Sequence, residues 1–150
     1  MPTRILVFIL LAIGISYAQS STRHYNLEDG LAIEGYDPVA YFTMGKALKG
    51  DPKIVAKVNG VRYNFMTEAH KALFVKNPQK YQPQYGGWCA YAMGATDNFV
   101  TVDPETFKII NGKLYLYFHN WVNNTLLKWN KDEANYLRKA DKNWAEKNKN

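Results

Sequence analysis

Two Asn-Gly pairs, Asn59-Gly60 and Asn111-Gly112, constrain the fold of this chain more than any other feature of its sequence. Both residues of such a pair tolerate the positive φ angles that a two-residue primed turn requires. Each pair lies between two apolar runs, which are Ile54–Val58 and Val61–Phe65 for the first pair and Phe107–Ile110 and Leu114–Phe118 for the second. The sequence therefore predicts two β-hairpins.

Helical patterns lie between and after the hairpins. Thr67 is placed to cap a helix that runs to about Asn77, and Pro78 follows the end of that helix. Two amphipathic helices are predicted near the C-terminus, and Asp132 between them is placed to cap the second. The first carries Trp121, Val122, Thr125, Leu126 and Trp129 on one face, and the second carries Leu137, Ala140 and Trp144. We therefore expect a small single α+β domain with two Asn-Gly hairpins, a central helix and two C-terminal helices.

Residues 1–18 have the pattern of a secretory signal peptide, with Arg4 before the apolar stretch Ile5–Ile15 and small residues at the cleavage positions. The stretch is shorter than the roughly 20 residues that span a bilayer, so an uncleaved anchor is the less favoured interpretation. Removing these 18 of 150 residues leaves 132, enough for one domain without disulfides. We expect a secreted or periplasmic protein with no stable membrane insertion after cleavage, a flexible lead-in over residues 19–30 and a domain over residues 31–147.

The formal net charge of the chain is +6, and much of the excess lies in residues 128–150. Lysines and an arginine alternate there with Asp132, Glu133, Asp141 and Glu146, so the segment contains no dense basic run. This pattern is typical of a solvated helix surface, and it argues against nucleic acid as a partner.

Cys89, the single cysteine of the chain, follows the glycine pair Gly86-Gly87 and lies between Trp88 and Tyr91. Glycines let the backbone come close to neighbouring groups, and a lone thiol supplies a soft ligand or a nucleophile. In an oxidising compartment such a thiol is buried as a small hydrophobe, paired with another chain or occupied by a ligand.

Several blocks of the sequence together resemble the YHS-domain family over about residues 31–145. The first three are Tyr36–Phe42, Gly60–Phe65 and Phe74–Tyr81. Pro83–Ala90, Gly112–Leu116 and Ala140–Trp144 are similar to the secreted or periplasmic branch of that family. In the metal-associated branch, cysteines provide thiolates at positions that match Ala40, Met66 and His70 here, so this chain lacks all the motif cysteines.

Met66 and His70 nevertheless keep a thioether and an imidazole at the spacing of two of those cysteines. Together with Cys89 and Met93 they form a predicted soft-metal donor set, which suits copper better than zinc, magnesium or calcium. This site requires Cys89 to be exposed and the four residues to approach one another. For each residue an ordinary role also stays open: core packing for Met66 and Met93, and an exposed or hydrogen-bonded ring for His70.

An enzyme would need Cys89 as a nucleophile with His70 or His119 as its base, and no spacing in the sequence selects such a set. We therefore expect a ligand-binding protein and no enzyme, with copper as the named ligand. The alternative is a structural or interaction module in which Cys89 is buried, no metal binds, and an unknown protein partner is recognised through a surface aromatic patch.

Overall fold

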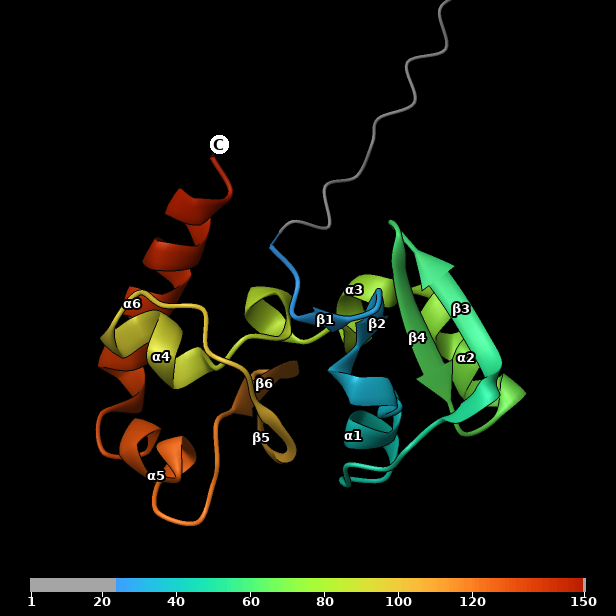
Figure 1. The fold of residues 1–150 in the computed structure, drawn as a ribbon, viewed down its shortest axis with the longest axis horizontal. Helices are drawn as coiled ribbons and strands as arrows, with labels where there is room; N and C mark the ends of the chain where they lie inside the picture. Colours follow the sequence, from blue (N-terminus) through green and yellow to red (C-terminus); the bar gives the residue numbers. More distant parts are fainter. Residues whose placement is uncertain (1–23, 150) are drawn as a thin grey trace, which may run out of the picture.

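A computed structural model describes residues 24–149 of the chain (Figure 1). The predicted signal peptide, residues 1–18, and residues 19–23 of the predicted lead-in lie outside the described residues. The strands are β1 (Leu27–Glu28), β2 (Leu31–Ala32), β3 (Asp51–Val58), β4 (Val61–Phe65), β5 (Asp103–Ile110) and β6 (Lys113–Tyr117). The helices are α1 (Ala40–Thr43), α2 (Glu68–Lys76), α3 (Pro78–Tyr81), α4 (Ala90–Ala95), α5 (Thr125–Trp129) and α6 (Glu133–Lys147), with 3₁₀ segments η1 (Ile33–Gly35) and η2 (Gln84–Gly87).

The described residues form one small domain that contains both helices and strands, which confirms the predicted α+β class. Four strands make a sheet in the order β1-β2-β4-β3, in which β2 and β4 run parallel and the other neighbours antiparallel. Strands β5 and β6 form a separate antiparallel hairpin. No helix within residues 24–149 is long and apolar enough to cross a membrane.

Both predicted hairpins are present, and their turns use the predicted Asn-Gly pairs. Asn59 and Gly60 have φ angles of 51° and 83°, and Asn111 and Gly112 have φ angles of 50° and 73°. The cap predicted at Thr67 is also present, because its side chain accepts a hydrogen bond from the backbone of His70 at 3.1 Å, and α2 begins at the next residue.

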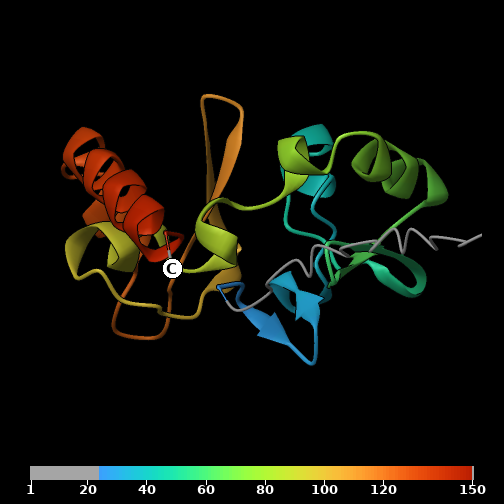
Figure 2. The same cartoon turned by 90° about the horizontal axis from the view of Figure 1, so that it is seen from above.

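Strand β6 separates two clusters of buried side chains. Leu114 and Leu116 pack with the four-stranded sheet and α2, whereas Tyr115 and Tyr117 pack with α4, α5 and α6. Successive side chains of a strand point to opposite faces, so one short strand contributes to both clusters. Figure 2 shows the β5–β6 hairpin between the C-terminal helices and the rest of the fold.

The N-terminal boundary differs from the prediction, because residues 24–30 belong to the fold. Strand β1 pairs with β2, and the backbone N–H of Asn26 donates to the carbonyl of Gly86 at 2.9 Å. A Cβ on Gly86 would lie 2.5 Å from the carbonyl oxygen of His24, so this close approach of two backbones requires glycine. The glycine pair that marks the Cys89 block therefore anchors the start of the domain.

The first of the two predicted C-terminal helices is shorter than expected. Helix α5 begins at Thr125, so Trp121 and Val122 precede it in a loop and are not part of its buried face. The second helix, α6, has Asp132 at its N-cap position as predicted. The Asp132 side chain makes no bond to the helix backbone and instead accepts from the side chain of Asn135.

Candidate functional site

The four predicted soft-metal donors lie in two different parts of the fold. Met66 and His70 lie just before and within the first turn of α2, whereas Cys89 precedes α4 and Met93 lies inside it. Helices α2 and α4 lie on opposite sides of the β5–β6 hairpin (Figure 1). Among the described residues, no three His, Cys, Asp or Glu side chains are grouped to hold a metal ion. The expected approach of all four donors is therefore absent from this structure.

Cys89 and Met93 are both fully buried. The Cys89 sulfur accepts a hydrogen bond from the backbone N–H of Phe118 at 3.3 Å and lies 3.4 Å from the hydroxyl oxygen of Thr125. Thr125 gives its own hydroxyl proton to the carbonyl of Phe118 at 2.8 Å, so the thiol is the donor toward Thr125. The exposure that a Cys89 metal ligand requires is not met.

His70 is held by a buried carboxylate, Asp37, to which the sequence analysis gave no role of its own. Its Nδ1 lies 2.6 Å from Asp37, and Asp37 is fully buried. Asp37 also accepts the backbone N–H groups of Val39 and Met66, each at 2.8 Å. Asp37 therefore ties the start of α1 to the start of α2, and the hydrogen-bonded role left open for His70 is the one observed.

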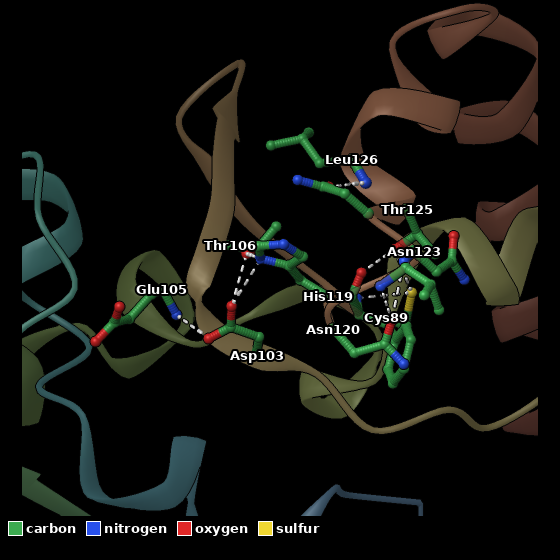
Figure 3. A network of polar contacts seen from close by, with 12 residues as sticks. Cys89, Asp103, Glu105, Thr106, His119, Asn120, Asn123, Thr125 and Leu126 are labelled. Atoms are coloured by element: carbon green, nitrogen blue, oxygen red, sulfur yellow. Dashed lines mark hydrogen bonds and ion pairs between the residues drawn. The ribbon is translucent and has the colours of Figure 1, made fainter.

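A second histidine, His119, is oriented by Asp103 and Thr106 (Figure 3). Its Nδ1 lies 3.1 Å from the Thr106 hydroxyl oxygen and 3.3 Å from a carboxylate oxygen of Asp103. Thr106 donates its hydroxyl proton to Asp103 at 2.8 Å. Both neighbours of Nδ1 are thus acceptors, so the network assigns the proton of the neutral ring to Nδ1 and leaves the lone pair on Nε2.

The loop after His119 is held by its own asparagines. The Asn120 side chain accepts the backbone N–H groups of Val122 at 3.1 Å and Asn123 at 2.9 Å. The Asn124 side chain accepts from the backbone of Leu126 at 3.0 Å and caps α5. These bonds order the loop locally.

Cys89 supports the base of the same loop, as Figure 3 shows. Its two partners, Phe118 and Thr125, are the residues at which the chain leaves β6 and enters α5. Phe118 and Thr125 are also joined directly, because the Thr125 backbone N–H donates to the Phe118 carbonyl at 3.0 Å. Cys89, the single cysteine of the chain, therefore acts as an internal support for the surface loop after β6.

The loop presents two apolar side chains to solvent. Trp121 and Val122 have relative exposures of 104% and 92%. Trp121, Asn120, His119 and Asp103 line an open hollow of about 430 Å³, which we call the Trp121 hollow. Its volume lies in the range of about 300–1,000 Å³ that is typical of small-molecule sites.

Comparisons with known protein families, with curated proteins and with solved structures found no match to this chain. The candidate site therefore depends on the geometry of the described residues alone.

No functional role was predicted from the sequence for three residues of the Trp121 hollow. Trp121 was assigned to a buried helix face, and Asp103 and Asn120 were given no role. The sequence contains one signal for the loop, which is the density of asparagines at Asn120, Asn123 and Asn124, because asparagine favours turns and caps over helix interiors. Nothing local in the sequence pairs Asp103 with His119, since the two are brought together by the β5–β6 hairpin.

Proposed function

We propose that this chain is a secreted or periplasmic, YHS-like binding domain that is not an enzyme and that binds its ligand at the Trp121 hollow. The observation that carries the proposal is the fully exposed Trp121 on a loop ordered by its own hydrogen bonds. An exposed indole is a common anchor of binding surfaces, and a loop already ordered in the free protein loses little entropy on binding. The YHS resemblance and the signal-peptide pattern support the family and the location.

The same surface agrees with the metal-free alternative considered from the sequence, in which Cys89 is buried and binding uses an exposed aromatic group. Under this proposal Cys89 contributes indirectly, through its bonds to Phe118 and Thr125. The unknown partner is then recognised by side chains of the loop after β6.

A fragment screen by nuclear magnetic resonance tests the proposal without knowledge of the natural ligand. ¹⁵N-labelled protein, residues 19–150, is titrated with a library of small neutral, anionic, cationic and aromatic compounds. We expect the resonance shifts to concentrate on Asp103, His119 and Trp121, and to disappear in Trp121→Ala. Leu127→Ala is the matched control, because Leu127 is also an exposed apolar residue, at 63%, and does not line the hollow. Shifts that concentrate elsewhere, or the absence of shifts, would contradict the proposal.

A second candidate function keeps copper as the ligand but dispenses with Cys89. Asp37 holds Nδ1 of His70, and a carboxylate behind a histidine ligand is a common arrangement in metal sites. The other ring nitrogen, Nε2, lies 3.4 Å from the Thr43 hydroxyl oxygen and would have to exchange that contact for the metal. Copper(I) competition against a chromogenic chelator distinguishes the candidates, using wild type, Cys89→Ser and His70→Ala. Our leading proposal predicts no tight one-to-one binding by the wild type. Tight binding that survives in Cys89→Ser and is lost in His70→Ala would favour the copper candidate.

A further inference from the structure

We infer that the Trp121 hollow binds the neutral sugar ring of a carbohydrate. This inference rests on the proposed function and adds the chemical class of the ligand. It follows from three properties of the hollow: the hydrogen-bonding groups that are free in it, its charge, and the exposed indole.

The free hydrogen-bonding groups are of both kinds. Nε2 of His119 offers a lone pair, because the Asp103 and Thr106 side chains hold the ring proton on Nδ1. Asn120 uses its side-chain oxygen inside the loop, so its amide N–H groups remain available. Within residues 24–149, neither this amide nitrogen nor the Trp121 indole N–H makes a hydrogen bond to another residue. The hollow therefore offers one acceptor and several donors.

The groups around the hollow disfavour anions and metal ions, for different reasons. An anion would meet the carboxylate of Asp103, which is already the acceptor for the Glu105 backbone at 3.0 Å and for Thr106. A metal ion would find one free ring nitrogen, His119 Nε2, because both oxygens of the Asp103 carboxylate already accept hydrogen bonds and the side chains of Asn120 and Trp121 present N–H donors. One imidazole is fewer ligands than a bound metal ion ordinarily requires. A neutral ligand with several hydroxyl groups meets neither difficulty.

A sugar hydroxyl matches the free groups because it both donates and accepts. One hydroxyl can donate to Nε2 of His119 while a neighbouring hydroxyl accepts from the Asn120 amide. The C–H face of a pyranose ring is apolar and carries partial positive charge on its hydrogens, so it is attracted to the negative face of an indole. Trp121 supplies that face, and the Asn120 and Asn124 hydrogen bonds hold its loop in place before any ligand arrives.

The inference is tested with three defined trisaccharides: cellotriose, maltotriose and triacetylchitotriose. Each is titrated into ¹⁵N-labelled residues 19–150, and the indole N–H resonance of Trp121 is followed. We expect saturable shifts of Trp121 and His119 with at least one trisaccharide, and a loss of affinity of at least about tenfold in Trp121→Ala. Asn120→Asp keeps the oxygen that orders the loop but removes the amide donors, so it should also weaken binding. Leu127→Ala should bind as wild type does.

The possible failures are distinguishable from one another. If none of the trisaccharides shifts Trp121 but library fragments still bind the hollow, the carbohydrate assignment is wrong and the proposed binding surface stands. Binding restricted to peptide-like or charged fragments would overturn the assignment in the same way and would indicate a protein partner. If neither sugars nor fragments bind, both the inference and the proposed function are wrong. A wild-type-like spectrum of each variant excludes misfolding as the cause of lost binding.

Discussion

Raising the pH should unfold this protein cooperatively, because its two core clusters contain an unusual number of buried phenol groups. Five tyrosines with side chains at most 3% exposed have pKa values raised above their ordinary value by burial, which penalises the charged form; they are Tyr41, Tyr63, Tyr85, Tyr115 and Tyr117. Burial raises the pKa of Tyr115 to about 12. The pKa values of the other four are raised further.

The size of the effect follows from linkage between ionisation and folding. In the unfolded chain a tyrosine has a pKa near 10, which is below the pKa of the same tyrosine in the fold. The stability that each neutral buried tyrosine contributes is therefore fully present below pH 10 and is lost as the pH rises toward the folded-state pKa. At about pH 11 each buried tyrosine removes about 1.4 kcal/mol of stability, and the five together remove about 7 kcal/mol. Domains of this size are stable by about 5–15 kcal/mol, so we expect unfolding at about pH 11–12.

Ultraviolet absorbance of tyrosinate and far-ultraviolet circular dichroism, recorded together during an alkaline titration, check this prediction. The buried tyrosines should ionise in the same step in which the helices and strands are lost. The reasoning would be refuted if all the tyrosines titrate near pH 10 while the fold stays intact.

The variant Tyr117→Phe provides the matched control for the alkaline titration. The Tyr117 hydroxyl is buried and has no hydrogen-bond partner among the described residues. Removing an unpaired buried hydroxyl should leave stability at neutral pH unchanged or raise it by about 1 kcal/mol. It should also move the alkaline midpoint upward, since one fewer buried group ionises. An unchanged or lower midpoint would count against the linkage argument.

Two further predictions concern packing and acid stability. Gly94→Ala should destabilise the protein by about 1–2 kcal/mol in urea unfolding despite the better helix propensity of alanine, because the new Cβ would lie 2.5 Å from the carbonyl oxygen of Tyr136 in α6. The change Ala95→Gly at the exposed neighbouring position measures the effect of helix propensity alone. A Gly94→Ala protein as stable as wild type would contradict the close packing of α4 against α6. The hydrogen bond from Lys108 lowers the pKa of Glu133 in the folded protein. The stabilisation that ionised Glu133 gives to the fold is therefore fully present above its unfolded-state pKa and is lost as the pH falls through its folded-state pKa. Glu133→Gln should therefore lower the stability of the protein at neutral pH and make that stability decline less steeply on acidification. If the urea midpoint of the variant depends on acid pH as that of the wild type does, the Lys108–Glu133 pair contributes nothing to stability.

Elements that depend on a few neighbouring residues could be predicted from the sequence. The Asn-Gly turns follow from which residues accept positive φ, and the Thr67 cap follows from a hydroxyl placed beside unpaired backbone N–H groups. Helix α6 follows from apolar residues at helical spacing. Helical spacing wrongly placed Trp121 and Val122 on a helix face. The side chains of Asn120 and Asn124 instead hold the backbone before α5 in a loop.

The sequence by itself determined the class of fold, the hairpins and helices α2 and α6, because turns, caps and periodicity involve residues close together in the chain. Only the tertiary structure decided where the candidate functional residues lie and which of them meet. It placed Cys89 under the loop instead of at the surface, separated Met66 and His70 from Met93, and joined His119 to Asp103 across a hairpin. Such contacts depend on how β6 divides its side chains between two cores, and no local pattern in the sequence encodes that division.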